Sequence, residues 1–257
     1  MTVYLVGAGP GSPDLLTVRA ARLLAAADIV VHDRLVDSRI LEMVPPTATV
    51  IDAGKYPGGP SDAQAHINAV LVDAARRTSV VVRLKGGDPY VFGRGGEEAV
   101  ALRSAGVEVE VVPGVSSAIA GPAAAGIPVT MRGLSSGFTV VTGHQDPAGT
   151  DPLDWEALAR LGTTLVVLMG ASRAAAIADR LLTAGMAPAT PVAAVESATS
   201  VEQRVLRSRL DELADLAEGT IQAPAVLVVG EVAGLDVADA EFGALVSEMA
   251  SETGGGR

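Results

Sequence analysis

Three glycine-containing loops, each placed directly after a predicted strand, carry residue types suited to holding a small molecule. They span residues 7–12 (GAGPGS), 85–89 (KGGDP) and 112–117 (VPGVSS). Glycines at the carboxyl end of a strand let a ligand lie against the backbone, and the carboxylate of Asp88 can accept a hydrogen bond from a ribose hydroxyl or an amino group. A tight turn explains one such loop, but three in one chain favour a binding site.

The first loop is similar to the dinucleotide-binding fingerprint but departs from it at two positions. Ser12 stands where a third glycine is needed for close packing of helix on strand. Pro10 lacks the backbone N–H that would bind a pyrophosphate. A loop poor in N–H donors suits a nucleoside without phosphates, although a simple strand–helix turn explains this motif alone equally well.

Asp33 follows the second predicted strand, and three interpretations of it are open. It can bind the ribose of NAD, about 20 residues after the glycines, act as an acid beside a reaction centre, or cap the next turn. Lys55 and Lys85 are the only lysines beside 17 arginines, which makes both candidates for chemistry, although a compositional bias explains most of the imbalance. The chain has no cysteine and its three histidines are scattered, so no metal site is expected.

The elements that must position these residues alternate in the manner of βαβ units. Short apolar runs predict strands at 3–6, 29–32, 80–84, 109–112, 138–142, 165–169, 192–195, 204–206 and 225–229. Amphipathic stretches predict helices at 15–27, with Ser12 as N-cap, and at 61–77, 97–105, 153–161, 173–184 and 210–217. The rhythm changes at 113–137, which is rich in Pro and Gly. We therefore expect an α/β fold of two lobes, 1–113 and 114–250, with a disordered tail at 251–257.

The composition limits the classes of partner and location. Hydrophobic residues make up 49% of the chain and aromatic residues 3%, which predicts an aliphatic core. No apolar stretch approaches the roughly 20 residues that span a bilayer, and no basic leader precedes the first strand. The net charge of −11 argues against nucleic acid as a partner. We expect a cytoplasmic protein that binds neither nucleic acid nor a membrane.

Taken together, the motifs resemble the tetrapyrrole methylase family of class III methyltransferases, in particular its uroporphyrinogen branch. The motifs are GAGPG at 7–11, DRLV at 33–36, GK at 54–55, RLKGGDP at 83–89, FGRGGEE at 92–98, VPG at 112–114, GIP at 126–128, VTGH at 141–144, LMG at 168–170 and VGEV at 229–232. They extend in order to about residue 235. Each motif is modest alone, but the set is specific.

The resemblance implies two α/β lobes with the active site in the cleft between them, usually in a homodimer. It implies S-adenosyl-L-methionine as methyl donor, with S-adenosyl-L-homocysteine as product, and uroporphyrinogen III as substrate. Two pyrrole carbons would be methylated in turn, to give precorrin-2 by way of precorrin-1 for sirohaem or cobalamin biosynthesis. The two lobes agree with the periodicity of the sequence.

By position, the resemblance also implies a set of cofactor-binding residues. These are Pro10, Gly86, Gly87, Asp88, Val91, Ser116, Ser117, Met169, Ala198 and Ala225. Ser117 stands where the family often has Ala, and Ala198 where it often has Gly. Both residues are small, so contact with the cofactor through the backbone should be retained. Met131 replaces a histidine that often precedes Arg132, so no role of that histidine applies here.

The resemblance assigns proton chemistry to Asp33 as acceptor and Lys55 as donor, with Arg94 also considered for proton removal. We rank Asp33 first, because arginine stays protonated and general bases are commonly carboxylates. Lys55 serves equally well as a clamp for a substrate carboxylate. Arg34, Arg94 and Arg132 match positions that bind the carboxylates of the substrate, which an acidic protein would otherwise repel.

Three alternatives remain beside this interpretation. The chain resembles, less closely, methylases that act on later precorrins or belong to the diphthine-type branch. An NAD-dependent oxidoreductase is disfavoured by Pro10 and by the missing third glycine. A non-catalytic binding module does not account for so many glycine loops.

Overall fold

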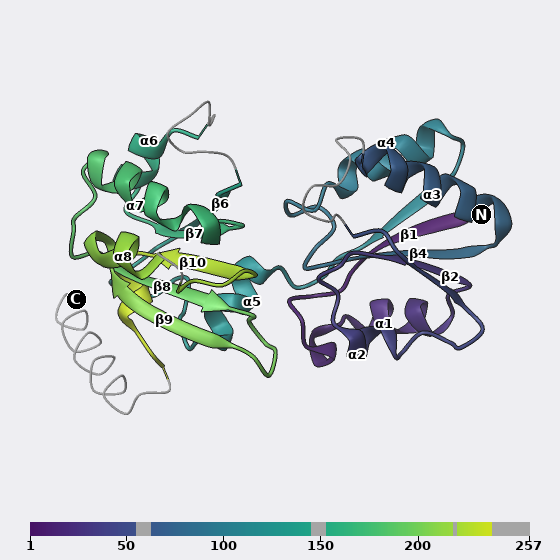
Figure 1. Ribbon diagram of the computed structural model, residues 1–257, viewed down its shortest axis with the longest axis horizontal. Coiled ribbons are helices and arrows are strands. Elements are labelled where there is room, and N and C mark those ends of the chain that lie inside the picture. Colours follow the sequence, from purple (N-terminus) through teal and green to yellow (C-terminus); the bar gives the residue numbers. More distant parts are fainter. Residues whose placement is uncertain (55–62, 145–152, 218–219, 238–257) are drawn as a thin grey trace, which may run out of the picture. The chain divides into compact units, whose positions relative to one another are not determined.

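The computed structural model describes residues 1–54, 63–144, 153–217 and 220–237. It divides into two compact units, Met1–Ser116 and Ser117–Arg257, each built on a sheet of five strands (Figure 1). Helices and strands alternate along both units, so the α/β class expected from the sequence is confirmed.

The sheet of the first unit is wholly parallel. Its strands are β1 (Thr2–Gly7), β2 (Ile29–His32), β3 (Thr49–Asp52), β4 (Val80–Lys85) and β5 (Glu108–Val112). They lie in the order β3-β2-β4-β1-β5, and every neighbouring pair is parallel. The carboxyl ends of all five strands therefore meet at one edge, which also receives the loops that the sequence marks for binding.

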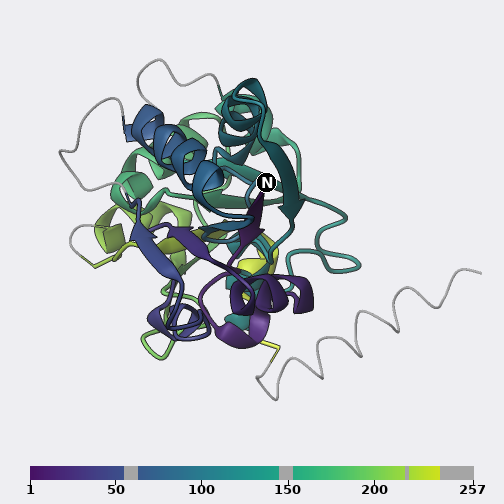
Figure 2. The ribbon, with the colours of Figure 1, turned by 90° about the vertical axis from the view of Figure 1, so that its right-hand side faces the viewer.

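Helices cover both faces of this sheet. On one face lie α1 (Val18–Ala25) and α2 (Ser38–Leu41), and on the other lie α3 (Ala63–Arg77) and α4 (Gly95–Ser104). Figure 2 shows this layering, with the blue α3 and the purple α1 on opposite sides of the strands. Buried aliphatic side chains fill both layers, as expected from a composition with so few aromatics.

The prediction for the first helix was wrong at its start. Residues Pro13–Leu15 form a single 3-10 turn, η1, and Leu16 is extended. The helix begins only after Thr17, whose hydroxyl accepts a hydrogen bond of 3.1 Å from the backbone N–H of Ala20. Ser12 and Pro13 have the composition of a helix start, but Thr17 provides the working N-cap.

Two elements of the first unit were not predicted, because both lack a strong pattern. The α2 helix is one turn, and the carboxylate of Asp37 accepts from the N–H of Arg39 at its start. The β3 strand lies at the edge of the sheet and is largely exposed, so it has no apolar run.

The β4 strand was predicted as apolar, yet it buries Arg83 and Lys85.

The second unit has a mixed sheet. Its strands are β6 (Phe138–Thr142), β7 (Thr164–Leu168), β8 (Pro191–Glu196), β9 (Arg204–Arg209) and β10 (Ala225–Val229), in the order β6-β7-β10-β8-β9. Strands β6 and β7 are parallel, whereas β10 is antiparallel to both β7 and β8, and β9 is antiparallel to β8. The last strand of the described residues thus occupies the centre of the sheet.

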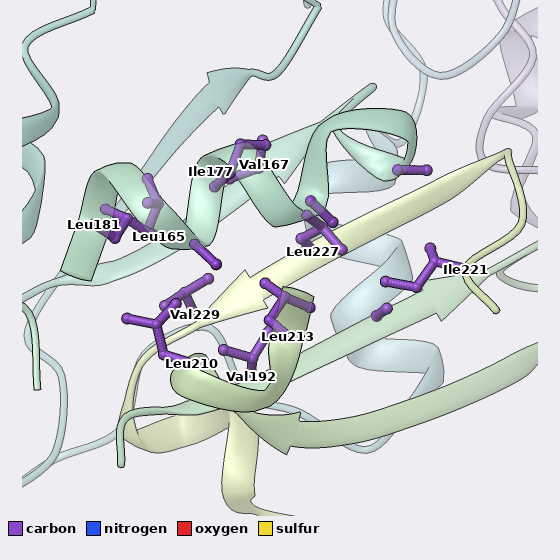
Figure 3. Packing of buried hydrophobic residues seen from close by; sticks show 14 of the residues in the cluster. Leu165, Val167, Ile177, Leu181, Val192, Leu210, Leu213, Ile221, Leu227 and Val229 are labelled. Atoms are coloured by element: carbon purple, nitrogen blue, oxygen red, sulfur yellow. The ribbon is translucent and has the colours of Figure 1, made fainter. Parts of the chain in front are cut away.

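Alternate residues of β10 serve two different cores. Leu227 and Val229 pack with Leu165 and Val167 against the helical layer that includes Ile177 (Figure 3). This layer consists of α6 (Trp155–Arg160), η2 (Ala171–Arg173), α7 (Ala174–Thr183), η3 (Leu210–Glu212) and α8 (Leu213–Ala217). The alternating side chains of β10 thus allow a single strand to complete the hydrophobic packing on both faces.

The opposite face of the second sheet is covered by α5 (Ser117–Ala124) and η4 (Glu231–Gly234). The small residues of α5 allow the helix to approach the sheet closely, because a Cβ at Gly121 would lie 3.1 Å from Cγ2 of Val226 in β10.

Among the helices of the described ranges, none combines the length and apolar character needed to cross a membrane.

Three loops of the first unit are packed backbone against backbone. A Cβ at Gly114 would lie 2.2 Å from the carbonyl oxygen of Gly87, and one at Gly7 would lie 2.5 Å from Cα of Gly114. Gly9 and Gly87 also exchange backbone hydrogen bonds of 3.1 and 2.7 Å. These glycines hold the loops after β1, β4 and β5 to one another.

We predict that Gly114→Ala lowers the free energy of unfolding by about 1–3 kcal/mol, because its Cβ would overlap a fixed carbonyl group. Gly96→Ala is the matched control, since a Cβ there meets nothing within 4 Å. In the helix α4 this control should leave stability unchanged or raise it by up to about 1 kcal/mol. Urea unfolding followed by circular dichroism measures both, and equal losses would contradict the loop packing described.

Candidate active site

The carboxyl edge of the first sheet gathers most of the candidate residues of that unit. Asp33 and Arg34 follow β2, and Pro10 follows β1. The loop after β4 supplies Gly86, Gly87, Asp88, Val91 and Arg94, and Ser116 lies in the segment after β5. The parallel sheet thus brings together residues that are up to about a hundred positions apart in sequence.

Gly86 differs from the glycines that pack loop on loop. It is exposed, and a Cβ built on it meets no atom within 4 Å. Its neighbour Gly87 has φ of 65°, a left-handed conformation that favours glycine. The backbone at Gly86 is therefore the part of this loop that a ligand can approach closely.

The side chain of Asp88 is already engaged within the protein. One carboxylate oxygen accepts from the backbone N–H of Tyr90 at 2.8 Å, and the other accepts from the N–H of Gly114 at 3.0 Å. Asp88 thereby ties the loop after β4 to the loop after β5. The sequence suggested contact with a ribose or an amino group, whereas the structure gives this carboxylate a role in fixing the two loops.

Arg94 stands at the N-cap position of α4 in a left-handed conformation, with φ of 59°. Its guanidinium forms a fork with the carboxylate of Glu97, with Nε–Oε1 and Nη2–Oε2 distances of 2.8 and 2.6 Å. This hydrogen-bonded pair raises the pKa of Arg94 above its ordinary value. A more basic guanidinium is suited to binding an anion and unsuited to accepting a proton.

Beneath the edge, Asp33 and Lys85 form a group of charged residues with Arg83 and Glu98, which the sequence prediction did not assign to the site. Arg83 donates from Nη2 to Oδ1 of Asp33 at 2.5 Å and to Oε1 of Glu98 at 3.1 Å. Lys85 Nζ donates to the same Glu98 oxygen at 2.9 Å and lies 3.9 Å from Oδ2 of Asp33. Burial lowers the pKa of Lys85 and the charge of Arg83 lowers it further, while Asp33 and Glu98 act in the opposite direction.

One sequence signal pointed to this group. Arg83 and Lys85 are two residues apart in a strand whose other residues are Val and Leu, so both side chains lie on the same face of the sheet. Central strands of a parallel sheet are usually apolar. Charged residues at alternate positions in such a strand indicate a buried network, although the sequence does not show which carboxylates complete it.

Part of the second sheet presents a comparable edge. Met169 follows β7, Ala198 follows β8, and Ala225 begins β10, which runs antiparallel to both. The register pairs Ala225 with Glu196 and Val226 with Leu168, so these three candidates lie at one edge of the sheet.

Three residues without glycine's freedom have left-handed backbones at this edge. Met169, Ser197 and Thr199 have φ of 56°, 43° and 68°. Such conformations cost about 1–3 kcal/mol each and are concentrated at functional sites. These conformations were not predicted from the sequence. They support a binding role for the segments after β7 and β8.

The other candidates are placed as follows. Ser117 is the first residue of α5, and Arg132 is exposed in the segment between α5 and β6. Lys55 lies outside the described residues. Within the described ranges, no group of three or more His, Cys, Asp and Glu residues is arranged to hold a metal ion.

Comparison with known proteins relates this site to one family. The sequence pattern of the Tetrapyrrole (Corrin/Porphyrin) Methylases matches residues 2–214. The S-adenosyl-L-methionine-dependent uroporphyrinogen III methyltransferase of Methanosarcina barkeri is 52% identical over 232 residues, which cover 90% of this chain and 91% of that protein. The uroporphyrinogen-III C-methyltransferase of Pseudomonas aeruginosa is 50% identical over 232 residues, covering 90% of this chain and 93% of the relative.

A solved structure extends the similarity to three dimensions. The uroporphyrin-III C-methyl transferase from Thermus thermophilus, complexed with S-adenyl homocysteine, is 46% identical with a TM-score of 0.77. The match covers 90% of this chain and 98% of that structure. The chain therefore belongs to the tetrapyrrole methylase family. The resemblance drawn from the motifs is confirmed.

We predict that Asp88→Asn lowers the free energy of unfolding by about 1–3 kcal/mol in the absence of any ligand. An amide places an NH2 group opposite the N–H of either Tyr90 or Gly114, so one of the two hydrogen bonds that the carboxylate accepts is lost. The exposed Asp14 provides the control, since Asp14→Asn should change stability by less than about 0.5 kcal/mol. If both variants unfold at the urea concentration of the unmodified protein, Asp88 has no role in joining the loops.

Proposed function

We propose that this protein transfers methyl groups from S-adenosyl-L-methionine to uroporphyrinogen III. Two pyrrole carbons would be methylated in turn, which gives precorrin-2 by way of precorrin-1. The observation that carries the proposal is the 52% identity to the M. barkeri enzyme over 232 residues, which reaches across both units. Family membership also disfavours the NAD-dependent oxidoreductase and the non-catalytic binding module considered from the sequence.

The residues at the strand edges fit the proposed cofactor. When bound, S-adenosyl-L-methionine supplies an electrophilic sulfonium methyl group. The exposed backbone at Gly86 admits a ligand, and the loop containing Pro10 lacks an N–H that a pyrophosphate would need. We assign cofactor binding to Pro10, Gly86, Gly87, the backbone of Asp88, Val91 and Ser116 in the first unit, and to Ser117, Met169, Ala198 and Ala225 in the second.

Asp33 is the residue that we assign to proton removal. Methylation of a pyrrole carbon leaves a proton to be removed, and a carboxylate is suited to accept it. The side chain of Asp33 is 32% exposed at the edge of the sheet, while Arg83 holds its Oδ1 from below. Arg94 is unsuited to this step because its fork with Glu97 favours the protonated form. Lys55 remains our proposal for proton donation or for holding a substrate carboxylate.

Three arginines are assigned to the substrate. Uroporphyrinogen III is a polycarboxylate, and a protein of net charge −11 needs local positive charge to bind it. Arg34 and Arg94 are exposed at the edge that carries Asp33, and Arg132 is exposed in the second unit. Guanidinium groups bind carboxylates through paired hydrogen bonds.

We also propose that the enzyme is a cytoplasmic homodimer whose product enters sirohaem or cobalamin biosynthesis.

Mass spectrometry after incubation with uroporphyrinogen III and methyl-labelled S-adenosyl-L-methionine tests the activity. We predict a product that carries two labelled methyl groups, with a singly methylated species at early times. Omitting the protein provides the blank, and NAD in a parallel calorimetric titration should not bind. Absence of labelled tetrapyrrole together with binding of NAD would overturn the proposal.

The cofactor assignment predicts a selective effect of Gly86→Ala. A methyl group there occupies the space that a ligand needs, so the Kd for S-adenosyl-L-homocysteine should rise at least about tenfold, or about 1.4 kcal/mol. Stability should be unchanged because that space is empty of protein atoms. Gly96→Ala adds the same group at another open position and should leave the Kd within about twofold, as measured by calorimetry. Equal affinities for the two variants would remove Gly86 from the cofactor site.

A further inference from the structure

Asp33 is the exposed end of a buried network that contains two cations and a second carboxylate. The side chains of Arg83, Lys85 and Glu98 are 1%, 2% and 1% exposed, whereas that of Asp33 is 32% exposed. The two positive charges, one on Arg83 and one on Lys85, formally balance the two negative charges of the carboxylates. The network thus reaches the surface of the first unit through Asp33 and is otherwise enclosed by the unit.

The hydrogen bonds hold the guanidinium of Arg83 from several directions. Its Nε and Nη2 donate to Oε1 of Glu98 at 3.3 and 3.1 Å. Its Nη1 donates to the carbonyl oxygens of Val31 and Leu84 at 3.4 and 3.3 Å. Nη2 also donates to Oδ1 of Asp33 at 2.5 Å. With both backbone and side-chain acceptors around it, Arg83 presents Nη2 to Asp33 in a fixed direction.

Glu98 is the centre of this arrangement. Its Oε1 accepts from Arg83, from Lys85 Nζ at 2.9 Å and from Nε2 of Gln64 at 3.3 Å. Its Oε2 is buried and has no hydrogen-bond partner among the described residues. The carboxylate of Glu98 is therefore arranged to hold the two cations through Oε1, while Oε2 makes no hydrogen bond with the described residues.

Stability alone does not account for such a network. Removing charges from water costs free energy that ion pairing often fails to recover, and apolar residues of similar volume commonly serve stability as well or better. An unpartnered carboxylate oxygen adds to this cost. The network is built around one group that reaches the edge of the sheet, which points to a role in the chemistry at that edge.

We infer that Glu98, Arg83 and Lys85 are positioning residues for Asp33, and this inference rests on the function proposed above. Glu98 holds Arg83, and Arg83 binds Oδ1 of Asp33. Oδ2 then lies 3.9 Å from Lys85 Nζ, beyond hydrogen-bond distance, and keeps its capacity to accept a proton. Burial and the charge of Arg83 lower the pKa of Lys85 below its ordinary value, and Asp33 and Glu98 counteract part of that effect.

The principal test is Glu98→Gln, alone and combined with Asp33→Asn. The amide keeps the shape of Glu98 but removes its charge, so Arg83 has a neutral acceptor in place of the carboxylate that holds its Nε and Nη2. We expect kcat to fall about 10- to 100-fold, with KM and the Kd for S-adenosyl-L-homocysteine within about twofold. In the Asp33→Asn background the same substitution should change kcat by less than about twofold, because it acts through Asp33.

A second readout does not depend on turnover. Rotation of a guanidinium group is slowed when several acceptors hold it, so the Nη–H resonances of Arg83 should be resolved in NMR spectra of the unmodified protein. They should merge in Glu98→Gln. Glu196→Gln is the matched control, because Glu196 is a buried carboxylate of the second unit that accepts from the N–H of Gln222 at 2.6 Å. It should leave the resonances of Arg83 unchanged.

The outcomes separate the inference from the proposed function. Additive losses of kcat in the double variant, or unchanged Arg83 resonances in Glu98→Gln, would overturn the inference. Merged resonances in a protein that methylates no uroporphyrinogen III would support the link to Asp33 and overturn the proposed function. If Glu98→Gln does not fold, Lys85→Met keeps Arg83 and Glu98 in place, and it should lower kcat only when Asp33 is present.

Discussion

The arrangement of the candidate site in the first unit depends on the close approach of three backbone segments. Where the loops after β1, β4 and β5 meet, no side chain fits between Gly7, Gly87 and Gly114. The carboxylate of Asp88 accepts a hydrogen bond from the N–H of Gly114, which joins two of these loops. Because the loops are fixed to one another, the exposed backbone of Gly86 has a defined place beside them. A binding surface made of backbone needs this rigidity, since a mobile loop would lose entropy when it binds.

At the same edge of the sheet, Asp33 is supported by buried charged side chains instead of by backbone contacts. A carboxylate placed on an apolar strand end would be free to rotate and to lose its charge. Here the pairing with Arg83, which Glu98 holds in turn, supplies direction as well as countercharge. The fold thus combines an exposed backbone surface for the proposed cofactor with a charged residue for the proposed proton transfer. Both depend on β4, which carries Arg83 and Lys85 and continues into Gly86.

Much of the fold could be predicted from the sequence, because most of its strands are short apolar runs. The bounds of β2, β6 and β10 agree with the prediction, and in β2 and β10 every aliphatic residue is buried. The exposed β3 strand and the start of α1 at Thr17 depended on the sheet edge and on a local cap. Glu98 was not recognised because its partners, Arg83 and Lys85, become neighbours only when α4 packs on the sheet.

The position of β10 has a consequence for how the second unit forms during synthesis. The ribosome releases β7 and β8 well before β10, yet β10 lies between them in the sheet. Until residue 229 has emerged, β7 and β8 each expose an unpaired edge with apolar side chains. Such edges favour pairing with other chains. The first unit, whose five strands end at Val112, can close earlier and independently of this delay.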